Sequence, residues 1–210
     1  MKIKTFITTY NRFGMLSKVV NHLNSFGIIP QIKDDGSTYN HNIPQYFRHE
    51  HRGINKFWIT WNEILEDCKD SDSELFLFMP DDFQDLDVKR VIALHYEYTK
   101  KGAYAYNIMN YGKKGLFNNV LEVIKGDTIM CGFVDCGFFC NREALDKLGY
   151  YMDKAEAKED SSGVGRQLSK RLLKARVIMY KPVKSLGYHD GHTVSEMHPL
   201  ERVKNPLKSL

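Results

Sequence analysis

The most constraining feature of this chain is a short run, Leu75–Met79, in which every residue is apolar. A strand with one face in water alternates apolar and polar side chains, whereas a strand buried on both faces is apolar throughout. The run stops abruptly at Pro80-Asp81-Asp82. We therefore expect a central strand that is covered on both faces of its sheet and carries two carboxylates at its end.

Strand and helix patterns alternate along the first hundred residues. Short apolar or β-branched segments predict strands, and apolar residues at helical spacing predict helices. In chain order these are a strand at 3–9, a helix at 15–26, a strand at 30–33, a helix at 54–68, the strand at 75–79 and a helix at 88–100. The helix at 54–68 has one continuous apolar stripe, so Trp58 and Trp61 are assigned to the core. Such alternation is typical of an α/β fold with a mostly parallel central sheet.

The rest of the chain continues this fold without a visible linker or repeat. Strands are expected at 103–109, 129–140 and 177–180, and a helix around Leu168, Leu172 and Leu173. A chain of 210 residues is long enough for one domain with a proper core and short for two. We predict a single domain over 1–192 and a basic C-terminal tail over 193–210.

Two pairs of aspartates follow predicted strands, Asp34-Asp35 and Asp81-Asp82. In parallel sheets ligands collect beyond the carboxyl ends of the strands, where both pairs fall. Each pair also has a plain structural explanation: Asp81 or Asp82 is suited to cap the next helix, and Asp-Gly-Ser after Asp34 is suited to a turn. Both explanations stay open for each pair taken alone.

Further acidic residues and a late histidine favour a metal site. Glu159-Asp160 ends an acidic stretch, and Tyr188-His189-Asp190-Gly191-His192 follows the last predicted strand. Carboxylate oxygens with one imidazole suit Mn²⁺ or Mg²⁺ better than a structural Zn²⁺. The sequence thus predicts a divalent metal site with a separate general base.

The order of these motifs resembles glycosyltransferase family two. The resemblance covers roughly residues 2–192, and it is carried by the combination of five motifs more than by any one of them. In chain order they are Thr8-Thr9-Tyr10-Asn11-Arg12, Asp34-Asp35-Gly36-Ser37, Leu77-Phe78-Met79-Pro80-Asp81-Asp82, Glu159-Asp160 and the late His. The resemblance implies a GT-A, Rossmann-like domain that binds a nucleotide sugar with Mn²⁺ or Mg²⁺.

The resemblance also implies roles for individual residues in donor binding. Residues that match the family's nucleotide-binding positions are Thr9, Tyr10 and Arg12 around the base, Asp35 at the base or ribose, Lys56 as a basic nucleotide contact and Asp81 at the ribose. Asp82 would bind the metal that bridges the diphosphate, and His189 would join it, with His192 as a competing candidate. Pro80 occupies the first position of the family's Asp-x-Asp motif, so only two carboxylates remain there and which of them binds the metal directly is open.

Catalysis would then fall to Glu159 and Asp160, which match the family's catalytic pair. Asp160 is the implied general base, which takes the proton of an acceptor hydroxyl as it attacks the anomeric carbon. The metal would neutralise charge on the leaving diphosphate. One base without a positioned nucleophile favours a single displacement with inversion.

Three other functions were weighed against this one. A metal-dependent nucleotidyltransferase usually opens with a Gly-rich phosphate loop, and none follows the first strand. A nuclease built on Pro80-Asp81 and Glu122-Val123-Ile124-Lys125 has only a short, common pattern behind it. A nucleic-acid-binding module built on the basic end leaves the ordered acidic motifs unexplained.

Charge and cysteine content bear on the acceptor and the compartment. Residues 1–165 carry a net charge of −3 and residues 166–210 a net charge of +7. A basic end of this kind suits an anionic partner, or it is a solvated face. It also suits the small phage-encoded enzymes that glycosylate hydroxymethylated bases in DNA; a saccharide is the other acceptor considered.

The four cysteines form no CxxC pair and are expected to be buried free thiols. No apolar run is long enough for a membrane helix, and no signal peptide is visible at the start. The expected location is the cytoplasm, or the host cytoplasm for a phage-encoded enzyme.

Overall fold

The computed structural model describes residues 1–38, 43–110, 123–135, 137–157 and 162–190. Its first half alternates strands and helices, and its second half adds the strands that complete the sheet. In chain order the elements are β1 Ile3–Thr9, α1 Phe13–Asn24, β2 Gln31–Asp34, β3 Tyr46–Arg48, α2 Gly53–Lys69, β4 Leu75–Pro80, β5 Phe83–Gln84, α3 Val88–Thr99, β6 Tyr104–Asn107, β7 Val123–Lys125, β8 Thr128–Cys131, β9 Phe138–Asn141, α4 Arg142–Leu148, α5 Val164–Lys174, β10 Ile178–Pro182 and β11 Tyr188–His189.

Within the described ranges, one mixed sheet of nine strands forms the centre, in the order β3-β2-β1-β4-β9-β6-β10-β8-β7. The first four strands of this order are parallel to one another, and β9 runs antiparallel between β4 and β6. Seven of the nine strands point the same way, and β8 and β9 oppose them. The predicted α/β domain with a mostly parallel sheet is therefore confirmed.

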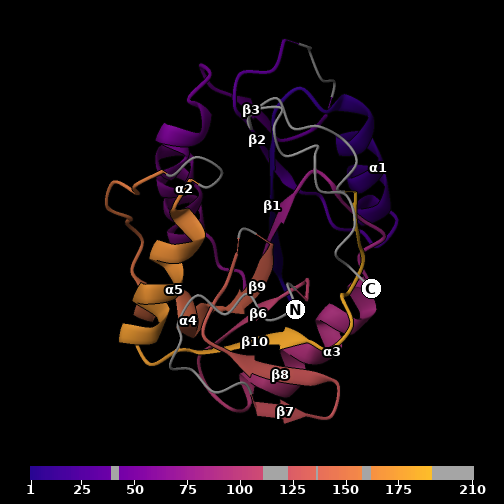
Figure 1. The fold of residues 1–210 in the computed structure, drawn as a ribbon. Coiled ribbons are helices and arrows are strands. Elements are labelled where there is room, and N and C mark those ends of the chain that lie inside the picture. The colour runs from indigo at the N-terminus through magenta and orange to yellow at the C-terminus, as the bar shows by residue number, and fades with distance from the viewer. Residues whose placement is uncertain (39–42, 111–122, 136, 158–161, 191–210) are drawn as a thin grey trace, which may run out of the picture.

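Helices cover both faces of this sheet, as the apolar run in β4 requires. Figure 1 shows α2, α4 and α5 on one side and α1 and α3 on the other. Along β4 the side chains alternate between the two cores: Phe76 and Phe78 join the cluster under α2 and α5, while Leu75, Leu77 and Met79 join the cluster under α1 and α3. Each such side chain, once fully buried, contributes about 1.5–3 kcal/mol to folding.

The predicted elements agree with the structure apart from one segment. Residues 129–140 were expected as one strand-like piece, but two strands are present there: β8 ends at Cys131 and β9 begins at Phe138. Trp61 is fully buried and stacks on Phe138, whereas Trp58 is only partly buried at the edge of the same core. Three of the cysteines are buried free thiols, as expected, namely Cys68, Cys131 and Cys140. Cys136 and the predicted tail at 193–210 lie outside the described residues.

The Arg142 side chain ties the end of α2 to the start of β4. Its guanidinium donates to the carbonyl oxygens of Cys68 (2.9 Å), Ser71 and Ser73 (3.1 Å). It also lies 4.5 Å from the centre of the Phe76 ring. These carbonyls belong to the turn that leads into β4, so Arg142 fixes the chain just before the strand that ends at Pro80-Asp81-Asp82.

We expect Arg142→Lys to lower the free energy of unfolding by about 2–4 kcal/mol, because an ammonium cannot reach all of these acceptors and hydrogen bonds to charged groups each contribute about 1.5–3 kcal/mol. Denaturant unfolding measures the change. Lys147→Gln, which breaks an exposed ion pair with Glu143 on the same helix, is the matched control and should change stability by at most about 0.5 kcal/mol. Equal effects of the two substitutions would contradict the role of Arg142.

Candidate active site

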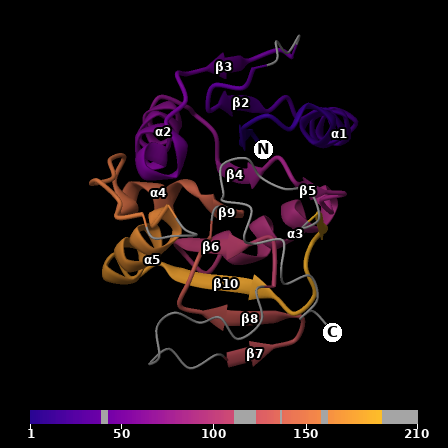
Figure 2. The same ribbon diagram turned by 45° about the horizontal axis from the view of Figure 1, so that its top comes forward.

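The carboxyl ends of β1, β2 and β4 converge at one edge of the sheet (Figure 2). In the parallel register, Thr9 at the end of β1 is opposite Asp34 at the end of β2, and Thr8 is opposite Pro80 at the end of β4. The backbone N–H of Asp35 donates to the Thr9 carbonyl at 3.0 Å. Both predicted aspartate pairs therefore lie beside the first strand.

Asp81 and Asp82, which we call the acid pair, are held by the last residue of β1, Thr9, and by Arg12 just after it. The Thr9 hydroxyl donates to Asp81 Oδ2 at 2.7 Å. A single nitrogen of Arg12, Nη1, donates to Asp81 Oδ1 at 3.0 Å and to Asp82 Oδ2 at 2.6 Å. The three side chains are nearly buried, with exposed fractions of 9% for Arg12, 5% for Asp81 and 11% for Asp82. Arg12 is thus the shared cation of two neighbouring buried carboxylates.

Burial and charge act differently on these groups. Burial raises the pKa of Asp81 to about 7, in spite of the opposing effect of the Arg12 charge. Burial also opposes ionisation of Asp82, but its hydrogen bond with His189 and the charges of His189 and Arg12 outweigh that effect and lower its pKa. Asp82 is therefore ionised at neutral pH, whereas the pKa of Asp81 lies close to neutral pH.

A small two-stranded sheet brings His189 to the acid pair. In this sheet β11 pairs antiparallel with β5, which directly follows Asp82, and His189 is opposite Phe83. The His189 Nε2 lies 3.3 Å from Asp82 Oδ2, and its hydrogen bond with that carboxylate raises the pKa of the imidazole. Gly187 makes this pairing possible, because a Cβ there would lie 2.6 Å from both the Gln84 carbonyl and the Phe83 ring.

Asp82, with His189 beside it, could hold a divalent metal whose remaining ligands come from a substrate. Asp82 Oδ1 is buried and has no hydrogen-bond partner among the described residues, so one carboxylate oxygen is available as a ligand. Among the described residues, no three His, Cys, Asp or Glu side chains converge on one metal position. Mg²⁺-type ions are commonly held by one or two carboxylates together with substrate phosphates, and this donor set matches that arrangement.

The second aspartate pair is built into the scaffold. Asp34 is fully buried and accepts hydrogen bonds from the Ser37 backbone N–H and hydroxyl and from the Tyr46 hydroxyl. Asp35 accepts from the backbone N–H groups of Arg52 and Gly53, each at 2.9 Å, and so satisfies two donors at the start of α2. The predicted turn at Asp34 is therefore present, and Asp35 has a structural role in addition to any role in binding.

The predicted nucleotide contacts Tyr10 and Lys56 lie beside this second pair. The Tyr10 ring stacks on His51, with 4.4 Å between the ring centres, and His51 Nδ1 lies 3.2 Å from Asp35 Oδ2. Lys56 is exposed and lines a shallow pocket of about 360 Å³ together with His51 and Arg52. The pocket thus lies beside the stacked rings of Tyr10 and His51, and its lining residues include neither Asp81 nor Asp82.

The structure brings most of the sequence-predicted residues into two adjoining groups. Thr9, Arg12, Asp81, Asp82 and His189 are linked by direct contacts, and Tyr10 and Asp35 are linked through His51. Arg12 was expected beside the base, but in this structure it bridges the acid pair. Sequence reasoning missed His51, whose only signal is its place just before the predicted helix. Glu159, Asp160 and His192 lie outside the described residues, as does Glu122 of the nuclease pattern.

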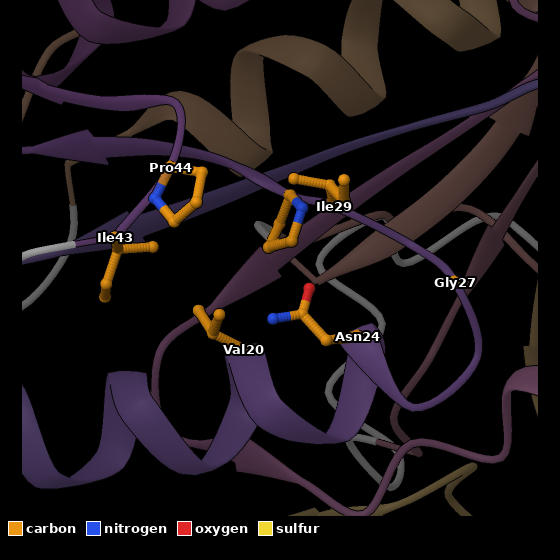
Figure 3. A pocket seen from close by; sticks show the side chains of 7 residues that line it. Val20, Asn24, Gly27, Ile29, Ile43 and Pro44 are labelled. Atoms are coloured by element: carbon orange, nitrogen blue, oxygen red, sulfur yellow. The ribbon is translucent and has the colours of Figure 1, made fainter.

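A separate hollow lies on the α1 side of β2 (Figure 3). It measures about 320 Å³, and its lining includes Val20 and Asn24 from α1, Ile29, and Ile43 and Pro44 from the segment before β3. Among the described lining residues, only Asn24 has a polar side chain. Since it brings no titratable group, this hollow offers no chemistry comparable to that of the acid pair.

The fold of this chain resembles α/β domains in solved structures. No protein-family model and no curated protein sequence matches it. The fold is shared with TarS from S. aureus. The structure of TarS 1-349 superposes with a TM-score of 0.53 and 16% identity, over 87% of this chain and 60% of that one. A second TarS structure gives a TM-score of 0.54 and 13% identity, over 87% of this chain and 36% of that one.

A197 from STIV superposes over 90% of this chain and 85% of its own, with 17% identity and a TM-score of 0.49, a level on which we base no argument. The chain spans less than two thirds of either TarS chain. The resemblance therefore establishes the architecture.

Within the described residues, no helix has the length and apolar character that a membrane crossing needs.

Asp35→Asn should lower the free energy of unfolding by about 1–3 kcal/mol, because an amide offers one acceptor oxygen to two buried N–H donors and removes a negative charge from a helix start. Thermal or denaturant unfolding measures the loss. Glu66→Gln removes an exposed carboxylate from the same helix and is the control, with little change expected. An unchanged Asp35→Asn protein would mean that α2 does not need this carboxylate.

Proposed function

We propose that this chain is a metal-dependent glycosyltransferase that moves a sugar from a nucleotide-sugar donor to an acceptor hydroxyl. The observation that carries the proposal is the convergence of Thr9, Arg12, the acid pair and His189 at the carboxyl ends of β1 and β4. Its support from outside the chain is the fold shared with TarS, a staphylococcal glycosyltransferase.

The donor would lie across the two groups of site residues. Asp82 and His189 would hold a Mn²⁺ or Mg²⁺ ion together with the diphosphate, and Asp81 would contact the ribose. When bound, such an ion neutralises charge on the leaving diphosphate. The nucleotide base would lie toward Tyr10 and Asp35, with Lys56 at the rim of the neighbouring pocket.

The chemical step would be a single displacement with inversion. Asp160 would accept the proton of the acceptor hydroxyl as that oxygen attacks the anomeric carbon, with Glu159 as the next candidate for the base. This part of the proposal rests on the sequence resemblance to glycosyltransferase family two. The alternative of a nucleotidyltransferase has less support, because no Gly-rich phosphate loop follows β1.

For the acceptor we propose a saccharide in preference to DNA. The basic residues of α5 are Arg166, Lys170, Arg171 and Lys174, and both lysines are exposed. Arg171, however, donates to the backbone carbonyls of Leu148 and Tyr151 and so belongs to the scaffold. Binding to duplex DNA would contradict the choice of a saccharide if the logarithm of its binding constant fell by about 0.9 per phosphate contact for each tenfold increase in salt concentration.

Asp82→Ala should abolish metal-dependent donor binding while the fold survives, and Asp82→Asn should lose most of it, because the amide carries no charge. Calorimetric titration with a nucleoside diphosphate, with and without Mn²⁺, measures the effect. Asp70→Asn, an exposed position at the end of α2, is the control and should bind as the wild type does. Unchanged affinity in Asp82→Ala would remove Asp82 from the metal site.

Asp160→Asn should lower turnover by a factor of roughly 10²–10⁴, because the amide keeps the shape of the side chain and cannot accept the proton. Donor binding should barely change, since this residue is proposed to face the acceptor. Transfer is followed by release of nucleoside diphosphate over a panel of nucleotide sugars with Mn²⁺ present. Near-normal transfer in this variant, together with a large loss in Glu159→Gln, would assign the base to Glu159.

A further inference from the structure

Arg12 places one positively charged nitrogen against both carboxylates of the acid pair. Its Nη1 lies within hydrogen-bond distance of one oxygen from each carboxylate, at 3.0 and 2.6 Å. The oxygen of Asp82 that it contacts, Oδ2, is also the one that His189 approaches at 3.3 Å. Arg12 Nη1 therefore contacts both Asp82, which we propose as the metal ligand, and Asp81, which we propose as the ribose contact.

A divalent ion bound to either oxygen of Asp82 would lie close to this guanidinium. Carboxylate oxygens lie about 2.0–2.1 Å from Mg²⁺. The free Oδ1 belongs to the same carboxylate as Oδ2, which Nη1 contacts at 2.6 Å, so an ion on either oxygen would come within several ångströms of Nη1. Two positive charges at that separation repel each other strongly where little water screens them. With exposed fractions near a tenth or below for Arg12 and both aspartates, screening is weak at this site.

Two buried atoms are left unsatisfied by the observed arrangement. Asp82 Oδ1 accepts no hydrogen bond, and Arg12 Nε donates none, among the described residues. A buried polar atom without a partner is costly, so both side chains have something to gain from a different partner. The bridge thus neutralises the acid pair but leaves room for replacement by a ligand that satisfies these atoms.

The backbone of Arg12 is fixed independently of its side chain. Arg12 is the N-cap residue of α1, and its carbonyl accepts hydrogen bonds from the backbone N–H groups of Met15 (3.1 Å) and Leu16 (3.0 Å). Rotation about the side-chain bonds would therefore withdraw the guanidinium while the start of α1 stays in place.

We propose that Arg12 is a resident counter-cation that competes with the divalent metal for the negative charge of Asp82, so that the guanidinium opposes metal binding there unless it withdraws. The inference deepens the proposed function, since it takes Asp82 as the metal ligand. It makes Arg12 a residue that sets metal affinity in the absence of nucleotide, a role different from the base contact implied by the sequence.

The test is direct binding of Mn²⁺ alone, without nucleotide or acceptor, followed by the paramagnetic resonance signal of the free ion. Arg12→Gln should bind Mn²⁺ about tenfold more tightly than the wild type, or better, because the competing charge is gone. Arg12→Lys, whose ammonium reaches less far, should show a smaller gain. Lys18→Gln removes an exposed positive charge from the same helix and should change the affinity less than about twofold, which separates local competition from net charge.

A folded Arg12→Gln protein that binds Mn²⁺ no more tightly than the wild type would overturn the inference. Circular dichroism and thermal unfolding establish that the variant is folded; if it is not, Arg12→Lys decides, and unchanged or weaker Mn²⁺ binding there overturns the inference equally. The gain must also disappear in the double variant Arg12→Gln/Asp82→Asn. If it persists, the tighter site is elsewhere and the inference fails.

The same measurements separate this inference from the proposed function. If the wild type binds no Mn²⁺ even with a nucleoside diphosphate, the proposed metal dependence fails, while a gain in Arg12→Gln that Asp82→Asn cancels still supports competition by Arg12. If the wild type binds Mn²⁺ with the nucleotide and Arg12→Gln shows no gain with Mn²⁺ alone, the proposed metal site stands and Arg12 is not its competitor.

Discussion

The neutralisation of two adjacent buried carboxylates is the constraint on which this end of the molecule depends. Asp81 and Asp82 follow the apolar strand β4 directly, so they emerge where the two cores leave little access to water. Unpaired charges at such a place are expensive, and removal of one partner from a buried ion pair costs about 3–5 kcal/mol. Arg12, Thr9 and His189 together supply a cation and hydrogen-bond donors. These contacts join β1, β4 and β11, which are far apart in the sequence.

The sheet topology delivers these groups without long loops. Parallel strands end at the same edge, so the residues after β1, β2 and β4 meet wherever the sequence between them is long enough for a crossover helix. The antiparallel pairing of β11 with β5 then brings His189, which is more than a hundred residues later in the sequence, to Asp82. Because the Asp190 backbone N–H donates to the Asp82 carbonyl at 2.9 Å, this return is fixed at the residue that needs it.

The sequence predicted the architecture and named several residues that meet at the candidate site, but it did not predict the contacts between them. Apolar patterns located β1, α1, α2, β4 and α3 because burial on one stripe or two faces leaves a periodic trace in the sequence. The aspartates were found because carboxylates after an apolar strand are unusual. The break between β8 and β9 was missed, since an apolar stretch such as 129–140 does not show where its backbone turns. Glu159, Asp160 and His192 stay predictions, and the structure describes His189 beside Asp82.

Which partner each charged side chain chooses could not be predicted, because that choice depends on side-chain direction and not on order along the chain. Arg12 follows Asn11, whose φ of 51° lies in the left-handed region, and this turn of the backbone leaves the guanidinium at the acid pair. Asp35 likewise points to α2, because the loop before that helix passes close to Gly36. A Cβ at Gly36 would lie 2.6 Å from the backbone nitrogen of His51. Arg12 and Asp35, which we propose as donor contacts, thus also hold the scaffold together. A ligand that binds them must therefore replace interactions that already stabilise the fold. Its affinity then reflects the free energy of its own contacts minus that of the contacts it replaces.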